Sequence, residues 1–195
     1  MRLAPGSVRL AVPPAVVGLL LAPLSLGFVA AGVALGVAVL WFHRDPAREP
    51  PETGILAPAD GRVSVVRREG DRLRVGIFMN VTDVHVNRAP IAGTVADREH
   101  VPGAHRPAFT KDSDRNERLH LEVGAVRVTL IAGWFARRIH PHVAVGDVVD
   151  RGERIGHVSF GSRADVLMPP EIDREDLAVR EGDRVRAGES VIARR

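Results

Sequence analysis

The sequence predicts a mainly β domain that is preceded by an N-terminal hydrophobic helical segment. The first observation is a stretch from Ala11 to Leu40 that contains no charged residue. The second is a series of short runs rich in Val, Ile and Leu beyond residue 54, separated by Gly, Pro, Asp and Asn, which is typical of strands and turns. The third is a short internal repeat near the C-terminus, which predicts tight turns on a β scaffold.

Residues 1–44 form the predicted membrane anchor, because about 20 apolar residues suffice to cross a hydrocarbon core. Proline breaks helices or begins them, so Pro13, Pro14 and Pro23 leave two shapes open: one helix from about residue 24 to residue 42, or a helical hairpin. A cleaved signal peptide is the alternative. It is disfavoured because the apolar run is long and no strong small-residue cleavage site follows it.

The end of this segment indicates a membrane interface. Trp41 and Phe42 are followed by His43 and Arg44, and aromatic and basic side chains in this order are typical of the headgroup level of a bilayer. Residues 45–54 are rich in proline and predict an extended linker.

The β-rich domain is expected over residues 55–195. Its predicted strands cover Ile55-Leu56, Val63–Val66, Leu73–Phe78, Gly93–Val95, Leu119–Val123, Val126–Ala132 and Arg154–Val158. The internal repeat joins Val145–Ile155 to Glu181–Val191 through a shared Gly-Asp-x-Val-x-x-Gly-Glu pattern. This pattern resembles the hairpin of lipoyl- and biotinyl-like β folds, and we expect both copies to serve as scaffold.

Composition excludes several classes of function. Residues 43–195 hold 25 basic and 24 acidic residues, so this part of the chain is close to neutral and lacks the basic surplus of a nucleic-acid-binding protein. The chain has no cysteine, which excludes disulfides, thiolate metal sites and a cysteine nucleophile. Lys111 is the only lysine and lies outside both repeats. A lipoyl or biotinyl carrier, which needs a lysine at the hairpin tip, is therefore disfavoured.

Four short motifs carry the candidate chemistry. In chain order they are Ala57–Gly61, Asp83–Pro90, Ile131–Ile139 and Phe160–Asp165, and the last contains a Gly-Ser step. This ordered set resembles the short-form phosphatidylserine decarboxylase proenzymes over about residues 40 to 170. The combination is specific although each motif alone is weak.

The resemblance implies self-cleavage between Gly161 and Ser162, which gives a β chain of residues 1–161 and an α chain that begins at Ser162. Attack of the serine oxygen on the Gly161 carbonyl would replace the amide with an ester, and elimination would then release the upstream chain. Residue 162 would be left as a pyruvoyl group, the cofactor of the mature enzyme. An electron-withdrawing group of this kind accepts the electrons released when carbon dioxide departs, so phosphatidylserine would become phosphatidylethanolamine.

His85 is the candidate base, because a serine hydroxyl needs a proton acceptor within hydrogen-bond reach and an imidazole titrates near neutral pH. Asp60 could hold the imidazole by accepting from its other nitrogen. By resemblance, Asp60 matches the aspartate of the family's Pro-Ala-Asp-Gly motif. His85 matches the first of two histidines in the longer bacterial form, and Arg88 stands at the second. Whether His85 acts in cleavage or in protonation stays open.

Substrate binding and metal binding rest on weaker signals. Arg88, Arg137, Arg138 and Arg163 are candidate partners for a lipid phosphate or carboxylate, since the planar guanidinium suits both anions. The alternative for each is an ordinary surface charge. His140 and His142 have the spacing of a metal pair, but two imidazoles without a further ligand motif predict no metal site.

These inferences together predict a membrane-anchored, pyruvoyl-dependent phosphatidylserine decarboxylase. Its expected partners are phosphatidylserine, membrane lipid and its own two chains, with no nucleic acid, and a homo-oligomer stays open. The expected location is the cell membrane, with the catalytic domain on the cytoplasmic side. The alternative is a membrane-tethered adaptor without catalysis. A decarboxylase of a soluble amino acid is disfavoured by the apolar N-terminus, and a pyridoxal phosphate enzyme by the polar surroundings of Lys111.

Overall fold

The computed structural model describes residues 2–103, 115–133, 139–158 and 162–194. The chain divides into two compact units, Met1–Ala47 and Arg48–Arg195. Arg48 and Pro50 belong to the second unit, although the sequence predicts them in a linker. A Cβ atom on Gly152 would lie 2.4 Å from Pro50 Cγ, so this part of the predicted linker packs against the β-rich domain.

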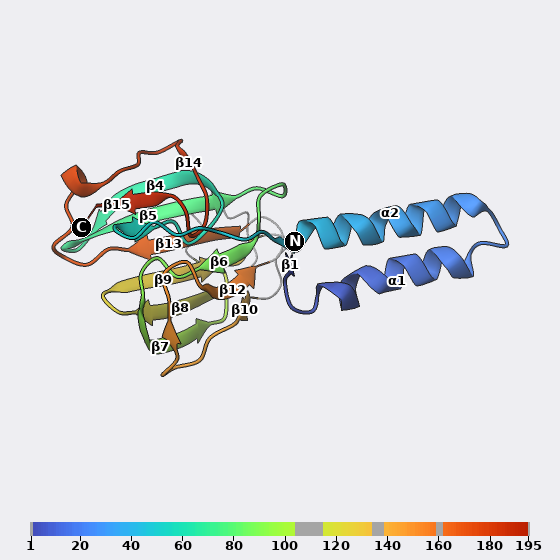
Figure 1. Ribbon diagram of the computed structural model, residues 1–195, viewed down its shortest axis with the longest axis horizontal. Helices are drawn as coiled ribbons and strands as arrows, with labels where there is room; N and C mark the ends of the chain where they lie inside the picture. Colours follow the sequence, from blue (N-terminus) through green and yellow to red (C-terminus); the bar gives the residue numbers. More distant parts are fainter. Residues whose placement is uncertain (1, 104–114, 134–138, 159–161, 195) are drawn as a thin grey trace. The chain divides into compact units, whose positions relative to one another are not determined.

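The first unit is a helical hairpin (Figure 1). Helix α1 (Ser7–Leu20) contains Pro13 and Pro14, and helix α2 (Leu26–Phe42) is capped by Ser25, whose hydroxyl accepts from the Gly27 amide. The helices approach closely at glycines: a Cβ atom on Gly32 would lie 2.4 Å from the Pro14 carbonyl oxygen. Strands β1 (Arg2–Leu3) and β2 (Arg44–Asp45) pair at the open end of the hairpin.

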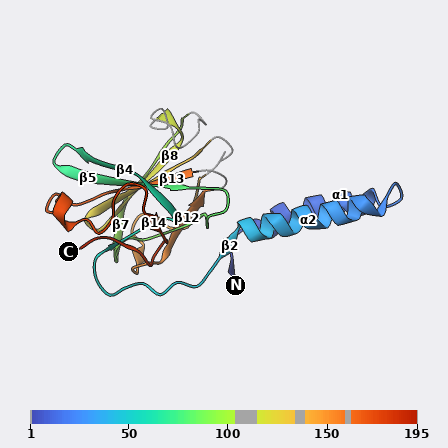
Figure 2. The same cartoon turned by 90° about the horizontal axis from the view of Figure 1, so that it is seen from above.

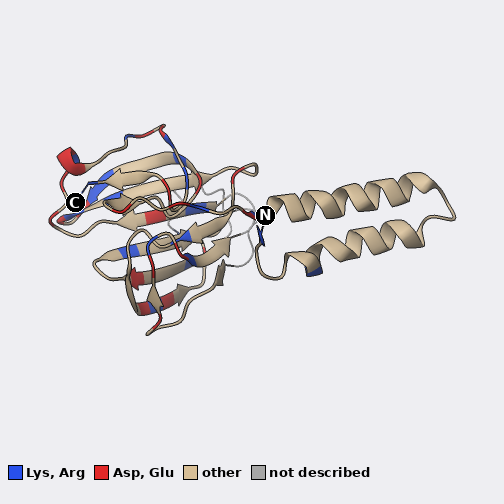
Figure 3. Ribbon diagram, viewed as in Figure 1, with Lys and Arg blue, Asp and Glu red and all other residues tan. Residues whose placement is uncertain are grey.

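The outer faces of both helices are apolar. Leu20 is 72% exposed and Leu26 is 79% exposed, and Figure 3 shows almost no charge along either helix. Within the described part of the chain, no helix combines the length and the apolar character that crossing a membrane requires. The predicted single span from residue 24 to residue 42 therefore gains no support, and the predicted anchor stays a proposal.

The second unit is mainly β, as predicted (Figures 1 and 2). Its largest sheet has the antiparallel order β11-β7-β8-β9-β13-β5-β4-β14. The members of this sheet are β4 (Gly61–Glu69), β5 (Arg72–Met79), β7 (Gly93–Val101), β8 (Arg118–Val123), β9 (Val126–Ile131), β11 (Val148–Val149), β13 (Ser162–Leu167) and β14 (Arg184–Val185).

In the described part of the unit, two smaller sheets and the short helix η2 accompany the large sheet. The first sheet has the order β10-β12-β6, and the second pairs β15 with β3. Their bounds are β3 (Ile55–Leu56), β6 (Val86–Arg88), β10 (Ile139–Pro141), β12 (Arg154–Val158) and β15 (Val191–Ala193), and the helix is η2 (Arg174–Asp176).

Strand β13 lies at the centre of the large sheet, between β5 and β9, and all six of its residues are buried. The local sequence does not indicate this strand, because Arg163 and Asp165 interrupt its apolar pattern. A strand that is covered on both faces need not alternate between apolar and polar residues. Here the two charged side chains pair with each other, as described below.

The two copies of the internal repeat form equivalent turns. Gly146 and Gly182 have φ values of +94° and +93°, which only glycine adopts readily. The amide of Gly146 donates to Val95 and the amide of Gly182 donates to Val63. The turns thus attach to equivalent strands, β7 and β4, and the unit contains two similar halves.

Candidate active site

Ser162 is the first residue of β13, and its side chain is fully buried. Its cross-strand partner on β5 is Met79, and the Ser162 hydroxyl lies 3.8 Å from the Met79 sulfur. The preceding residues, Gly161 included, lie outside the described part of the chain. The hydroxyl at the predicted cleavage site therefore faces the protein interior rather than solvent.

Three of the four sequence motifs meet around Met79. The Asn87 Nδ2 atom lies 3.7 Å from the Met79 sulfur and 3.4 Å from the Pro58 carbonyl oxygen. A Cβ atom on Gly61 would lie 3.3 Å from the Met79 Cα, so the turn after Asp60 is packed directly on β5. Together with Ser162, these contacts gather the motifs of residues 57–61, 83–90 and 160–165 in one place.

Asp60 is held by an arginine and a backbone amide. The Arg48 Nη2 atom lies 2.9 and 2.8 Å from its two carboxylate oxygens, and the Ala187 amide donates to Oδ1 at 2.8 Å. The sequences Ala57–Val63 and Ala89–Val95 occupy equivalent places in the two halves, so Asp60 corresponds to Ala92. The scaffold itself does not require this carboxylate, which supports a role in the site.

His85 is buried, and its Nδ1 atom lies 2.9 Å from the Asp83 carbonyl oxygen. Because a carbonyl only accepts, Nδ1 carries the proton and Nε2 is the basic nitrogen of the neutral ring. The expected hydrogen bond from His85 to Asp60 is not formed: the backbone of Asp83 occupies Nδ1, and Arg48 and Ala187 occupy the Asp60 carboxylate. The His85 carbonyl accepts from the Val158 amide at 3.2 Å, which places His85 beside the end of β12, four residues before Ser162.

Arg88, a predicted substrate-binding residue, is buried between the two repeats. Its Nη1 atom donates to the Gly152 carbonyl at 2.9 Å, and a Cβ atom on Gly188 would lie 2.9 Å from its Cδ. The side chain thus holds the two turns together. Arg137 and Arg138, the next two candidates, lie outside the described residues.

Arg163, the last predicted substrate-binding residue, forms a buried ion pair with Asp165. Its Nε atom lies 2.8 Å from Asp165 Oδ1, and Arg74 Nη1 lies 3.0 Å from Oδ2. Gly76 makes room for the carboxylate, since a Cβ atom there would lie 2.7 Å from Oδ1. Side chains alternate along a strand, so Arg163 and Asp165 lie on the opposite face of β13 from Ser162.

Asn116 holds the end of β9, the second strand that pairs with β13. Its Nδ2 atom donates to the Ala132 carbonyl at 2.8 Å, and the Ala132 amide donates to the Glu117 carbonyl. Ala132 follows Ile131, the β9 partner of Arg163. This contact places Asn116 at the end of β9, beside the start of β13.

Two histidines, His140 on β10 and His157 on β12, lie on the sheet that contains β6, and His142 directly follows β10. His140 stacks on His157 at 4.5 Å between ring centroids, and His142 Nε2 lies 2.9 Å from His157 Nδ1. One imidazole of this pair must accept, so at most one of the two carries a charge while the hydrogen bond exists. Among the described residues, no three His, Asp or Glu side chains are placed to hold a metal ion.

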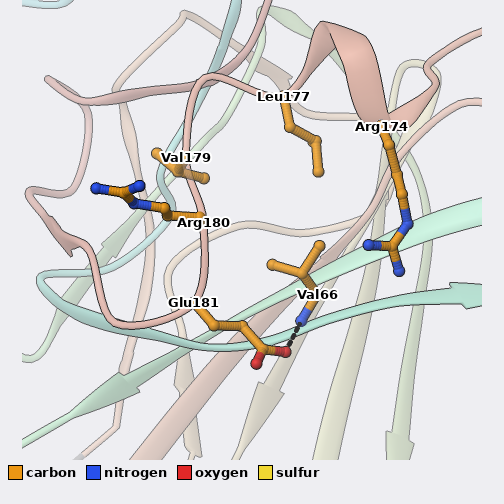
Figure 4. A pocket seen from close by; sticks show the side chains of 6 residues that line it. All are labelled: Val66, Arg174, Leu177, Val179, Arg180 and Glu181. Carbon is orange, nitrogen blue, oxygen red and sulfur yellow. Dashed lines mark hydrogen bonds between the residues drawn. The ribbon is translucent and has the colours of Figure 1, made fainter.

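Among the described residues that line a cavity of about 540 Å³, none belongs to the four motifs (Figure 4). It is lined by Val66, Arg174, Leu177, Val179, Arg180 and Glu181. A smaller cavity of about 300 Å³ is lined in part by Gly61 and Asp83, two motif residues, and by Arg62 and Arg184. Arg184 Nη2 lies 3.2 Å from Asp83 Oδ1 there, so the smaller cavity adjoins the candidate site.

Comparison with known proteins gives a consistent result. The family described as phosphatidylserine decarboxylase matches residues 35–193. A Halobacterium salinarum protein named as an archaetidylserine decarboxylase proenzyme is 55% identical over 191 residues, which are 97% of each chain. A Thermobifida fusca protein named phosphatidylserine decarboxylase proenzyme is 51% identical over 167 residues, covering 83% of this chain and 76% of that protein.

Proposed function

Because the chain belongs to the phosphatidylserine decarboxylase family, we propose that it cleaves itself between Gly161 and Ser162 and then removes carbon dioxide from the headgroup of a serine phospholipid. The observation that carries this proposal is the gathering of three sequence-distant motifs around the Met79 and Ser162 pair. A non-catalytic adaptor is not favoured, because the relatives are named as decarboxylase proenzymes.

The proposed cleavage uses groups of this chain and one water molecule. His85 Nε2 takes the proton of the Ser162 hydroxyl, and Oγ bonds to the Gly161 carbonyl carbon while the peptide C–N bond breaks and its nitrogen gains a proton. This step gives an ester at residue 162. Loss of the α-proton of residue 162 then breaks the Cβ–O bond and releases the upstream chain as a carboxylate. Water replaces the nitrogen, which leaves as ammonia.

The surroundings of Ser162 fit the pyruvoyl group that results. The group replaces a small, fully buried side chain, and Met79, which contacts both Ser162 and Asn87, supplies a soft sulfur rather than a competing charge. When present, the pyruvoyl group supplies the electron sink for decarboxylation. In our proposal, Asp60 and Arg48 position the turn of residues 57–61 against β5, and His85 holds or delivers a proton at Nε2.

The substrate class follows from the headgroup. Phosphatidylserine and archaetidylserine, the lipids named for the relatives, share phosphoserine and differ in their tails. The hairpin of α1 and α2 is the proposed anchor, since its outward side chains are apolar and Arg44 lies 4.1 Å above the Trp41 ring in an arrangement suited to an interface. We propose that it holds the enzyme at the cell membrane with the catalytic unit on the cytoplasmic side.

Denaturing mass spectrometry of the purified protein tests the processing step. We expect a fragment of 34 residues, Ser162–Arg195, blocked by a pyruvoyl group. Ser162→Ala should stay uncut and inactive, and Asp60→Ala and His85→Ala should accumulate precursor.

A second assay measures the release of carbon dioxide from phosphatidylserine and from archaetidylserine in mixed micelles. Equal rates would show selection for the shared headgroup, and unequal rates would show selection between the lipid tails. An intact, fully active Ser162→Ala protein would remove the mechanism, and normal processing in both other variants would remove their assigned roles.

A further inference from the structure

Asn87 combines complete burial with an unused hydrogen-bonding atom. The residue lies on β6 and is 0% exposed. Its Oδ1 atom has no hydrogen-bond partner in the part of the chain that the structure describes. Buried polar atoms are nearly always paired, so such an atom needs an explanation.

The orientation of the carboxamide is fixed by its neighbours. The Pro58 carbonyl can only accept, so the Asn87 atom that faces it at 3.4 Å must be the nitrogen. This leaves Oδ1, an acceptor, as the atom without a partner. An acceptor in this position needs a donor that the described chain does not supply.

The unused acceptor belongs to a side chain that contacts the same sulfur atom as Ser162. Asn87 Nδ2 and Ser162 Oγ both lie against the Met79 sulfur, at 3.7 and 3.8 Å. The position of Ser162 beside Met79 is set by the cross-strand pairing of β13 with β5. The position of Asn87 is set by its cross-strand pairing with Gly156 on β12.

The proposed substrate has one headgroup donor that suits this acceptor. The phosphate and the carboxylate of a serine headgroup are anionic and accept hydrogen bonds, whereas the amino group donates them. Amines react with ketone carbonyls such as that of the pyruvoyl group. The amino nitrogen is therefore also the headgroup atom that must come closest to residue 162. Resting on the function proposed above, we propose that Asn87 is a substrate-binding residue whose Oδ1 accepts a hydrogen bond from the amino group of the serine headgroup.

Two variants separate this role from a structural one in the full chain, assayed in phosphatidylserine micelles. Asn87→Leu removes the acceptor at similar size, and Asn87→Asp keeps an acceptor oxygen. Thr129→Val is the matched control, because Thr129 is a buried polar residue of the same unit whose hydroxyl pairs with His120. The inhibitors are phosphatidylethanolamine and phosphatidylethanol, which differ only in the amine.

We expect Asn87→Leu to be cleaved normally and to raise KM about tenfold with kcat within about twofold, as for the loss of one hydrogen bond to a charged donor. Inhibition by phosphatidylethanolamine should weaken by the same factor, while inhibition by phosphatidylethanol stays unchanged. Asn87→Asp should keep KM within about threefold of the original, and Thr129→Val should leave KM unchanged.

Several results would overturn this assignment. One is an unchanged KM in Asn87→Leu, and another is an equal weakening of both inhibitors. Loss of cleavage in Asn87→Leu but not in Thr129→Val would show that the acceptor serves the precursor hydroxyl instead. If Asn87→Leu does not fold, a tenfold rise of KM in Asn87→Asp is the overturning result. A wild-type chain that is uncut and inactive would instead refute the proposed function.

Discussion

One nitrogen of Arg48, Nη2, lies within 2.9 Å of both carboxylate oxygens of Asp60. Both side chains are largely buried, with 6% and 14% of their surfaces exposed. The Arg48 Nη1 atom also contacts Glu189 at 3.2 Å. The arginine therefore links the turn of residues 57–61 to the second repeat, and it comes from a segment that the sequence predicted to be only a linker.

Arg48→Met should destabilise the protein by about 2–4 kcal/mol, because removing one partner leaves a buried carboxylate without its counter-charge. Denaturant unfolding in detergent measures the free energy. Arg48→Lys keeps the charge and should lose less, and the double variant Arg48→Met/Asp60→Asn should recover part of the loss. A change of less than about 0.5 kcal/mol in Arg48→Met would show that the pair contributes little.

Arg163→Met should lower thermal stability and leave KM for the lipid unchanged once the protein is folded. The reason is that Arg163 is committed to Asp165, on the face of β13 opposite to Ser162. Calorimetry and steady-state kinetics on the same preparation make the comparison. Asp165→Asn, which leaves Arg163 and Arg74 without their shared carboxylate, should destabilise at least as much. A rise in KM of tenfold or more in Arg163→Met with normal stability would restore its predicted role in substrate binding.

His120 should make the fold sensitive to mild acid. Burial lowers the pKa of His120 below its usual 6.5, and the nearby Arg118 and Arg127 act in the same direction. The unfolded chain then binds a proton more readily than the folded one, so stability is intact above about pH 7 and is lost as the pH falls below 6.5.

His120→Gln should reduce this loss. The measurement is the difference in Tm between pH 7.5 and pH 5.5, which should be smaller in the variant than in the original protein. Thr129→Val, which removes the hydroxyl 2.8 Å from Nδ1 and leaves the imidazole titratable, is the control. Equal losses in His120→Gln and the original protein would show that other groups set the acid sensitivity.

The sequence predicted the mainly β class and, apart from β13, the described strands of five or more residues, because their apolar runs and turn residues are local signals. It missed β13, since the pairing of Arg163 with Asp165 depends on a covered face that no local pattern reveals. It assigned Asp60, His85 and Ser162 to one site from their motifs, and this assignment stays a prediction. It could not predict the partners of Asp60, because Arg48 and Ala187 are brought there only by the folded chain.

Asn87 and Asn116 show the same limit in the site itself. Asn87 lies within one of the four quoted motifs and Asn116 lies outside them, and in both cases a buried asparagine has no signature that separates a structural amide from a binding one. The orphaned oxygen of Asn87 and the contact of Asn116 with Ala132 become visible only with coordinates. Met79 carried no sequence signal at all, although the motifs meet around it.

The apolar tip of the helical hairpin should bind lipid bilayers. Leu20 and Leu26, at the ends of α1 and α2 that adjoin the connecting turn, are among the most exposed apolar residues of the unit. Burying one leucine side chain contributes about 1.5–3 kcal/mol. The double substitution Leu20→Glu/Leu26→Glu should therefore lower the vesicle-bound fraction more than tenfold in flotation assays.

The control for added charge is Val145→Glu/Val148→Glu, which changes two exposed valines of the β unit and should float like the original protein. Equal flotation of all three proteins would contradict the proposed anchor, and loss in both variants would assign binding to charge rather than to the hairpin.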